Sequence, residues 1–449
     1  MKDLDYKRIE VPDKVEYIIE VLEKNGFKAY MVGGCVRDSL CDIVPHDYDI
    51  TTSALPEDVI NLFDKTIPTG LKHGTVTVVI EGEMFEVTTF RVDGEYLDSR
   101  RPEEVIFVKD LREDLSRRDF TINAMAYNNS EGLQDFFDGE VDLENSIIRT
   151  VGDPHKRFEE DALRMMRAVR FSAQLGFSIH KDTLEAIEDL NYLIDNISVE
   201  RIREEVNKIL LSDSNCIELL LQLGLLERFM PEVVACNGCL QNNPYHIYDV
   251  FKHTLVATKF IKPVLYLKLT MLFHDIGKVP CKTTDENGID HFYHHPKESC
   301  DMARDIMKRL KYDNKTIDKV LILIKYHDIT LNSKKSIRKL LTKISKEDFE
   351  DLLLVKEADM RAHNPKYLDE SLEKIKIIRE KYLEILEEAN CLSLKDLAID
   401  GRFLIEKGYA SQGKEIGMLL NYLLDRVIEE PEKNNVYDLT EYINEYKNK

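Results

Sequence analysis

Several features that are scarce or missing narrow the range of folds and functions. The chain of 449 residues has no tryptophan and only 19 glycines and 13 prolines, a composition that favours helices over loop-rich or all-β folds. No apolar run approaches the length that crosses a bilayer, and the start of the chain lacks the apolar segment of a signal peptide. We therefore expect a cytoplasmic protein with no membrane partner.

An excess of positive charge is also missing. The chain carries 62 Lys and Arg against 83 Asp and Glu, a formal charge of −21. A field of this sign repels nucleic acid, so a nucleic-acid partner would have to meet a local basic surface. Residues 308–346, with twelve Lys and Arg against three Asp and Glu, are the candidate surface, although a solvated helical face has a similar composition.

The eight cysteines do not form a recognisable disulfide or zinc framework. Without a secretory signal they indicate free thiols in a reducing compartment. Cys236 and Cys239 form one C-x-x-C pair, but no second pair completes a zinc site, so we expect this pair to be structural.

Hydrophobic patterning changes near residue 150. After an amphipathic stretch at Asp13–Lys24, five short runs rich in β-branched and aromatic residues predict strands, at Ala29–Val32, Tyr48–Thr51, Thr75–Ile80, Phe85–Phe90 and Val105–Val108. Beyond Pro154 the apolar spacing becomes three and four, which predicts helices. The fold class is therefore α+β, with a mixed-sheet head (1–150), a helical neck (151–210), a helical body (211–365) and a helical tail (366–449).

The first candidate site combines glycines with carboxylates. Gly33–Gly34 lie at a predicted strand-to-helix turn, where backbone N–H groups can approach an anion. Asp47 and Asp49 lie two apart on a predicted strand, so both side chains leave the same face, and Glu86 follows on a neighbouring strand. Adjacent carboxylates repel each other unless a cation lies between them, which suits Mg²⁺ and phosphates. The set predicts metal-dependent phosphoryl transfer, with a solvated strand end as the alternative.

Two basic segments follow. Arg117 and Arg118 before Asp119 suit a triphosphate and a ribose hydroxyl, although a helix-start Asp beside two exposed arginines has the same pattern. Downstream, every third residue of a predicted helix is Asp161, Arg164, Arg167 or Arg170. Cytosine and adenine each present an amine donor beside a ring-nitrogen acceptor, whereas uracil and guanine present the reverse.

An acceptor such as Asp161 with a donor such as Arg164 would therefore select C and A without a template. Arg167 and Arg170 could then hold the triphosphate. A salt-bridged surface helix would show the same spacing.

These motifs, in the order GGCVRD, DYD, RRDFTINAMA, DGEVDL and EDALRMMRAVRF over residues 25–210, resemble the class II CCA-adding enzymes. The segment RVDGEYLDSRRP is similar to the flexible-loop region of that family. The resemblance implies a polymerase-β-like nucleotidyltransferase head that builds the 3′-terminal CCA of tRNA from CTP and ATP, with no DNA partner. It implies catalysis by the carboxylates, with Mg²⁺ on Asp47 and Asp49, and nucleotide binding by Gly33, Gly34, Arg37, Arg118, Asp119, Asp161, Arg164, Arg167 and Arg170.

A second candidate site lies in the helical part, where eight of the twelve histidines fall between His246 and His363. His253, the pair His274–Asp275 and the later Asp359 resemble the HD phosphohydrolase superfamily. Imidazole and carboxylate ligands suit a second divalent metal. The resemblance implies an HD-type body and, as a hypothesis, removal of phosphates from a tRNA end, including a 2′,3′-cyclic phosphate.

Several alternatives share part of this pattern. A bacterial poly(A) polymerase has the same head motifs, but a basic tail would suit it better than the acidic one here. A split-activity enzyme adding only CC or only A is another alternative. A phosphohydrolase with an inactive head, or a non-catalytic tRNA-binding module, would not need the carboxylate pair.

Overall fold

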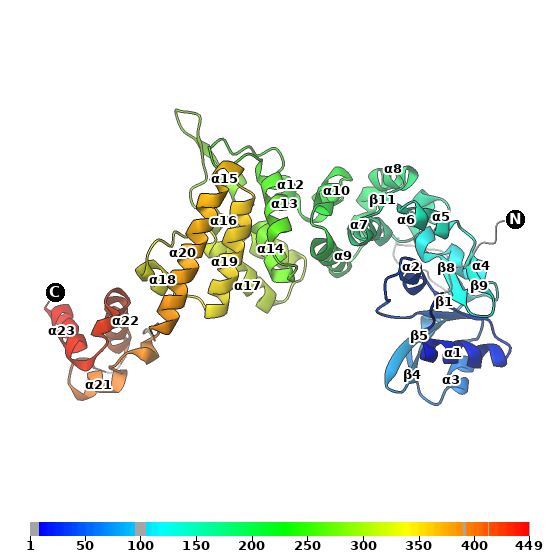
Figure 1. The fold of residues 1–449 in the computed structure, drawn as a ribbon, viewed down its shortest axis with the longest axis horizontal. Coiled ribbons are helices and arrows are strands. Elements are labelled where there is room, and N and C mark those ends of the chain that lie inside the picture. Colours follow the sequence, from blue (N-terminus) through cyan, green and yellow to red (C-terminus); the bar gives the residue numbers. More distant parts are fainter. Residues whose placement is uncertain (1–8, 95–104, 389–391, 412, 449) are drawn as a thin grey trace. The chain divides into compact units, whose positions relative to one another are not determined.

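A computed structural model describes residues 9–94, 105–388, 392–411 and 413–448. The chain forms two compact units, Met1–Phe229 and Met230–Lys449 (Figure 1). The first contains the residues predicted as head and neck, together with the helices up to Phe229. Most of the segment RVDGEYLDSRRP falls within residues 95–104, outside the described residues.

The head is built on a seven-stranded mixed sheet. Its strand order is β3-β4-β5-β2-β1-β8-β9, in which β2 and β5 run parallel and the other neighbours antiparallel. The strands are β1 (Ala29–Val32), β2 (Ile50–Thr52), β3 (Thr66–Gly70), β4 (Thr75–Ile80), β5 (Glu83–Thr89), β8 (Met125–Asn128) and β9 (Gly132–Asp135). A separate antiparallel pair joins β6 (Arg91–Asp93) to β7 (Val105–Phe107). The predicted α+β class with a mixed sheet is confirmed.

The central strand β1 is buried on both faces. Met31 belongs to a core cluster with helices α1 (Asp13–Lys24), α2 (Gly34–Leu40) and α3 (Pro56–Leu62). Tyr30 and Val32 point to the opposite cluster, which includes Leu111 and Leu115 of α4 (Leu111–Ser116). Because alternate side chains of a strand leave opposite faces, this pattern fixes the register of the sheet.

Strand β2, which was predicted to carry Asp47 and Asp49, begins later in the chain than predicted. Strand β2 starts at Ile50, so Asp47 and Asp49 lie in the segment directly before it and not on the strand. The main chain at Asp49 already contacts β1, since its carbonyl accepts a hydrogen bond from Val32 N–H at 3.0 Å. The prediction that a strand places both aspartates was therefore wrong in its boundary, because the β2 ladder starts one residue after Asp49.

The predicted continuous helix around Asp161 is also interrupted. Helix α6 (Pro154–Glu160) ends before Asp161, whose backbone is extended (φ −142°, ψ 101°), and α7 (Leu163–Leu175) begins two residues later. The Asp161 carboxylate accepts the Leu163 N–H at 3.1 Å, as aspartates do at helix starts. Asp161 is thus at the helix junction, and only the three arginines lie on α7.

The remaining elements of this unit are mostly helical. Helix α7 packs against α9 and α6 against α8. The helices are α5 (Gly139–Glu144), α8 (Lys181–Leu190), α9 (Val199–Ser212), α10 (Cys216–Gln222) and α11 (Leu225–Phe229), with 3₁₀ turns η1 (Leu71–His73), η2 (Thr121–Asn123) and η3 (Asn191–Asn196) and a short parallel pair β10 (Ile147–Ile148) and β11 (Ser178–Ile179).

Among its described residues, the second unit is helical apart from one hairpin of β12 (Thr283–Thr284) and β13 (Asp290–His291). Its first helices are α12 (Pro231–Val234), α13 (Val250–Phe260), α14 (Leu265–Phe273), α15 (Lys278–Cys281), α16 (His295–Arg309), α17 (Asn314–Tyr326), α18 (Lys334–Leu341), α19 (Lys346–Arg361) and α20 (Leu368–Glu387). Helix α14 is apolar on nearly every side and packs against α13, α16, α17 and α19. This central position explains why its end can bring several helices to one point.

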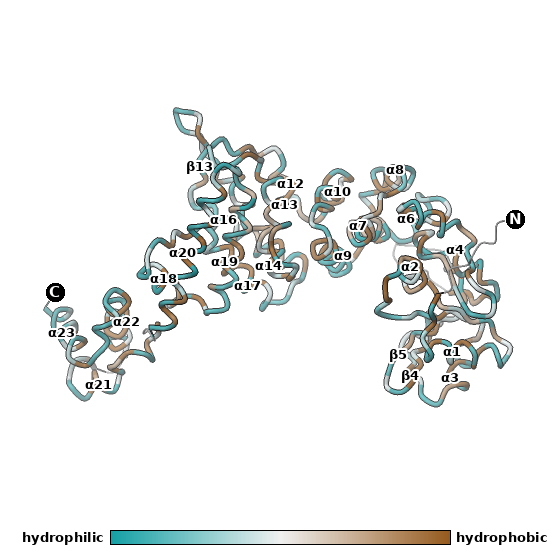
Figure 2. The backbone as a smooth tube through the Cα atoms, viewed as in Figure 1, coloured by the Kyte–Doolittle hydropathy of each residue, from teal (hydrophilic) through white to brown (hydrophobic). Residues whose placement is uncertain are grey.

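The end of the chain has a small core of its own, with Leu419, Leu423, Val427, Leu439 and Ile443 among its buried members. Its elements are α21 (Gly401–Glu406), α22 (Lys414–Glu429) and α23 (Val436–Lys447), with 3₁₀ turns η4 (Pro365–Tyr367), η5 (Leu394–Asp396) and η6 (Pro431–Lys433) in this unit. Hydrophobic and hydrophilic residues alternate along the helices, as in amphipathic helices (Figure 2). Within the part of the chain that the structure describes, no helix has the length and apolarity of a membrane span.

Candidate functional sites

The glycine turn lies directly against Arg118. Gly33 has φ +81° and donates its N–H to the Met125 carbonyl at 3.1 Å. The positive φ favours glycine, and a Cβ at this position would lie 2.9 Å from Arg118 Nη1, so a larger residue would displace that guanidinium. Arg118 is also 3.7 Å from the buried carboxylate of Asp114. The turn after β1 therefore presents a guanidinium beside the start of α2.

The head carboxylates influence one another. The parallel register pairs Ile50 with Val87, which places Asp49 beside Glu86 on the next strand. Partial desolvation by the surrounding protein atoms, together with the charges of Asp47 and Glu86, raises the pKa of Asp49 to about 6 against the lowering effect of Arg118. All three side chains still reach solvent. An oxygen-only donor set under mutual repulsion fits Mg²⁺.

Three arginines converge on one aromatic ring. The guanidinium carbons of Arg37, Arg167 and Arg170 lie 5.2, 5.3 and 4.2 Å from the centroid of Phe171. Phe171 is held edge-on against Phe120 at 5.7 Å. The sequence pattern did not single out Phe171, because an aromatic residue on a helix is usually a simple core residue. Here it gathers positive charge from α2 and α7 at one place.

Each of these arginines is fixed by a polar partner. Arg37 donates to Asn123 Oδ1 at 2.7 Å, and Arg170 lies 3.1 Å from Glu205. Arg167 Nε donates to Asp119 Oδ2 at 2.7 Å. Asp119 is buried, which opposes its ionisation, but the charge of Arg167 and hydrogen bonds from Asn123 and Arg167 hold its pKa at about 2. The Asp119 carboxylate therefore faces Arg167 in this structure.

The two residues that we expect to read the base flank the α6–α7 junction. Asp161 Oδ2 accepts from Arg201 at 3.0 Å. Arg164 is held by Glu160 at 2.9 Å and donates to the Arg117 carbonyl at 2.8 Å. The anchors Arg201 and Glu160 were not found from the sequence, since ordinary surface pairs have the same composition. The acceptor Asp161 and the donor Arg164 are therefore each held in place by a different partner, close to the α6–α7 junction.

Comparisons with known proteins match this architecture along the chain. Family models match at residues 29–149 (Poly A polymerase head domain), 176–236 (RNA and SrmB-binding site of polymerase A) and 283–443 (tRNA nucleotidyltransferase domain 2). The CCA-adding enzyme of Lactobacillus helveticus is 37% identical over 428 residues, covering 95% of each chain. The chain belongs to the CCA-adding enzyme family.

Other CCA-adding enzymes also match this chain, in sequence or in fold. That of Pediococcus pentosaceus is 36% identical over 95% of this chain and 96% of its own. The crystal structure of the Bacillus stearothermophilus CCA-adding enzyme in complex with CTP matches with a TM-score of 0.73 at 30% identity, covering 98% of this chain and all of the other. The Thermotoga maritima CCA-adding enzyme complexed with tRNA shares the fold, with a TM-score of 0.61 at 18% identity over 97% and 96% of the two chains.

The four residues predicted for the second site come together in the helical unit. His253 lies on α13, His274 and Asp275 follow α14, and Asp359 lies near the end of α19. His253 Nε2 is 2.9 Å from Asp359 Oδ1 and 3.4 Å from Asp275 Oδ2, and His274 Nε2 is 3.2 and 3.6 Å from the same Asp275 and Asp359 atoms. One ligand atom from each residue lies within 4.8 Å of the others.

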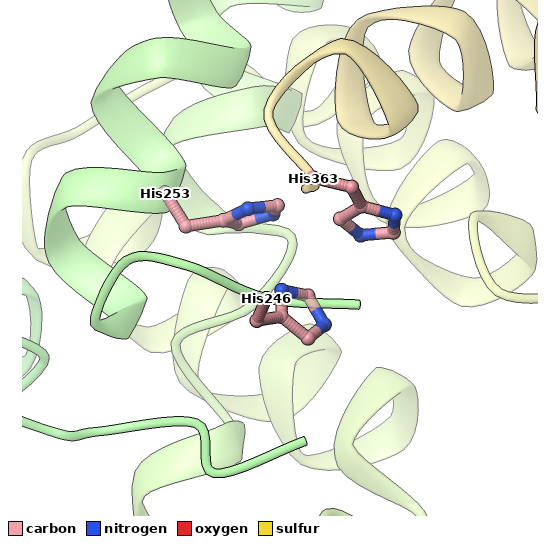
Figure 3. A group of neighbouring side chains, drawn as sticks. All are labelled: His246, His253 and His363. Atoms are coloured by element: carbon pink, nitrogen blue, oxygen red, sulfur yellow. The ribbon is translucent and has the colours of Figure 1, made fainter. Parts of the chain in front are cut away.

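Four more histidines surround this cluster. His295 and His327 lie beside Asp275, while His246 and His363 lie beside His253 (Figure 3). The sequence places these histidines in the right region but offers no spacing rule that assigns them to the site. A cavity of about 360 Å³ opens onto the cluster and is lined by Lys278, His246, His363, Asp328 and Tyr293 among others.

Several basic residues of the segment 308–346 form ion pairs within their own unit. Lys319 contacts Asp348 and Asp351 at 2.6 and 2.7 Å, and Lys334 and Arg338 contact Glu388 at 2.5 and 2.9 Å. These ion pairs reduce the positive field that the composition suggests. They favour the solvated-face interpretation for the members that they involve.

Proposed function

We propose that this protein adds C, C and A to the 3′ end of tRNA, using CTP and ATP without a template and releasing pyrophosphate. The membership in the CCA-adding enzymes supports the reaction. The observation in the structure that carries the proposal is the convergence of Arg37, Arg167 and Arg170 around Phe171, between the glycine turn and the α6–α7 junction.

We assign three roles to these residues: metal binding, triphosphate binding and choice of the base. Asp47 and Asp49, with Glu86 nearby, would hold Mg²⁺, which supplies charge neutralisation at the phosphates and activation of the tRNA 3′-hydroxyl. The arginine cluster with Arg118 and the turn at Gly33–Gly34 would bind the triphosphate.

Base choice would depend on Asp161 as acceptor and Arg164 as donor. Because each is held by its own anchor, a base with the reverse donor–acceptor order would leave buried polar groups unpaired. Asp119 would keep Arg167 in place for the phosphates.

One assay tests the reaction and separates it from its relatives. Purified protein is given tRNA lacking CCA with each NTP alone and in combination. Three added nucleotides, C-C-A, are expected. A long run of A would instead indicate a poly(A) polymerase, and addition of only CC or only A would indicate a split-activity enzyme.

The metal assignment has its own test. Asp47→Ala and Asp49→Ala should each abolish nucleotide addition while tRNA binding, measured by filter retention, stays close to that of the wild type. Asp64→Ala, at an exposed aspartate of the same unit, is the matched control. Near-normal turnover in either site variant would show that the assignment is wrong.

A second function is favoured by the buried histidine–aspartate cluster. We propose that His253, His274, Asp275 and Asp359 hold a divalent transition metal in an HD-type domain that hydrolyses phosphates at a tRNA end. In this reaction water adds to phosphorus and one P–O ester bond breaks, opening a 2′,3′-cyclic phosphate or releasing phosphate from a monoester.

Metal-free protein is assayed with a 2′,3′-cyclic nucleotide after addition of Ni²⁺ or Co²⁺. We expect the wild-type protein to hydrolyse the nucleotide and Asp359→Asn to show no hydrolysis. No turnover with either metal would leave a structural role only.

A further inference from the structure

Asp114, on α4, is a buried carboxylate that the sequence motifs did not single out. It is 0% exposed and lies three residues before Arg117 and four before Arg118. Burial opposes its ionisation, but the charges of Arg117 and Arg118, together with hydrogen bonds from Arg117 and the Arg91 N–H, lower its pKa. Asp114 is therefore a buried anion, and such a group is stable only where its partners are fixed around it.

One oxygen of this carboxylate holds Arg117 and the start of β6. Asp114 Oδ1 accepts hydrogen bonds from Nε and Nη2 of Arg117 at 3.1 and 2.9 Å and from the Arg91 N–H at 3.2 Å. Arg117 Nε also donates to the Arg91 carbonyl at 3.1 Å. The Asp114–Arg117 pair therefore holds Arg91 by both its N–H and its carbonyl, and two of the Arg117 nitrogens have partners within the protein.

The other oxygen faces Thr51 and Arg118. Asp114 Oδ2 accepts a hydrogen bond from Thr51 Oγ1 at 3.2 Å and lies 3.7 Å from Arg118 Nη2. The second distance is that of an ion pair but is too long for a hydrogen bond. Thr51 lies on β2 two residues after Asp49, whose carboxylate also attracts Arg118. Two carboxylates linked through β2 therefore attract the Arg118 guanidinium.

Arg118 keeps N–H donors that the protein does not occupy. A Cβ at Gly33 would lie 2.9 Å from Arg118 Nη1, which shows how closely the guanidinium lies against the glycine turn. Among the described residues, the buried Nε of Arg118 has no hydrogen-bond partner. A guanidinium has five N–H donors, and a contact by charge alone fixes its position without occupying them. Phosphate oxygens bind to such donors.

We propose that Asp114 is a positioning residue for nucleotide addition, whose charge holds Arg118 at the glycine turn with N–H groups left for a triphosphate. The inference rests on the proposed binding of the triphosphate by Arg118. Asp114 is fully buried and acts only through that guanidinium. Without its charge, Arg117 and Arg118 would repel each other. The carboxylates of Asp49 and Asp119 would then set the position of Arg118 instead.

Kinetic constants for both nucleotides test the role of this charge. Asp114→Asn keeps the size of the side chain and removes its charge. Initial rates of addition are measured with CTP on tRNA lacking CCA and with ATP on tRNA ending in CC. KM for CTP and for ATP should each rise roughly tenfold while kcat changes much less, because ground-state and transition-state binding of the triphosphate are weakened alike. An unchanged KM for both nucleotides would overturn the proposal.

The choice of base separates this route from a displacement of Arg117. The Arg117 carbonyl accepts a hydrogen bond at 2.8 Å from Arg164, which we assign to base selection. If Asp114→Asn acted by releasing Arg117, the preference for CTP over UTP would fall together with the affinity. We expect the preference of the wild type to be kept. A loss of preference as large as the rise in KM would overturn the proposal.

A double-variant cycle tests whether the effect passes through Arg118. Asp114→Asn combined with Arg118→Ala should have the KM of Arg118→Ala alone, because the group that Asp114 positions is already absent. Independent, multiplicative effects on KM would overturn the proposal. Asp142→Asn is the matched control, since Asp142 is 3% exposed and accepts hydrogen bonds from Arg149 and Thr121. This variant should have a lower Tm and a KM close to that of the wild type.

Thr51→Val covers the case in which Asp114→Asn does not fold. Valine has the size of threonine and suits a strand, but it lacks the hydroxyl that donates to Asp114. KM for both nucleotides should rise roughly threefold, and Thr51→Ser, which keeps the hydroxyl, should resemble the wild type. Equal KM values in Thr51→Val and Thr51→Ser would overturn the proposal.

The same assays distinguish this inference from the proposed function. A wild type that adds no nucleotide would refute the proposed function and the role of Asp114 with it. Normal addition by the wild type, with an unchanged KM in the variants, would refute the role of Asp114 alone.

Discussion

Replacement of Asp119 by asparagine should change how the stability of the protein depends on pH. Asp119 is 8% exposed and ion-paired to Arg167, and its pKa is about 2 against an ordinary value of 3.8. At roughly 1.4 kcal/mol per pH unit, this difference corresponds to about 2 kcal/mol of folding free energy. Because the pKa is lower in the folded state, the contribution is complete above about pH 4 and is lost as the pH falls towards 2.

Urea unfolding of wild type and Asp119→Asn, followed by circular dichroism from pH 7 to pH 2, measures this effect. Asparagine cannot ionise, so the variant should be less stable than the wild type at pH 7, and the gap should narrow by about 2 kcal/mol towards pH 2. Asp64→Asn, at an exposed aspartate, is the control and should keep a constant gap. Parallel profiles for wild type and Asp119→Asn would refute the role of the Asp119–Arg167 pair.

Three further substitutions test other contacts. Gly33→Ala, at φ +81° and with its new Cβ 2.9 Å from Arg118, should lower kcat/KM for nucleotide addition at least tenfold while circular dichroism shows a retained fold. Gly277→Ala would bring a Cβ within 2.4 Å of the α16 backbone and should destabilise the helical unit by about 1–3 kcal/mol in thermal unfolding; an unchanged Tm would contradict the packing. Arg201→Ala should free Asp161, raise KM for CTP and ATP, and weaken discrimination against UTP, with partial recovery in Arg201→Lys; unchanged discrimination would remove Arg201 as a positioning residue.

Local sequence patterns were sufficient for much of the fold. The bounds of α1, β1 and β4 are those predicted, because each follows from hydrophobic periodicity and neighbouring turn residues within the segment. The prediction of one continuous helix through Asp161 failed, in part for a non-local reason. The residue leaves the helix where its carboxylate accepts the Leu163 N–H and pairs with Arg201, which is 40 residues away in the chain. No helical periodicity records such a partner.

In the head site, too, local sequence patterns predicted some features, whereas tertiary contacts determined the others. The sequence predicted its motif residues but not which of them contact one another. Phe171 became part of the site only when α2 and α7 placed three arginines around it. In the basic segment 308–346 the sequence misled in the opposite direction: composition counts Lys334 and Arg338 as positive but does not record that Glu388, directly after α20, lies beside them.

The second site depends most on tertiary packing. A motif in chain order predicted His253, His274, Asp275 and Asp359, because a His, a His-Asp pair and a later Asp resemble the HD phosphohydrolase superfamily. His295 lies at the start of α16 and His327 at the end of α17, and they meet only because these helices pack against each other and against α14. Packing that leaves a buried carboxylate between four imidazoles, with only the Lys278 ammonium paired to one of its oxygens, would be costly without a ligand. The cost is removed if the packing and the metal form one folded state, so metal loading should stabilise the helical unit as well as complete its site.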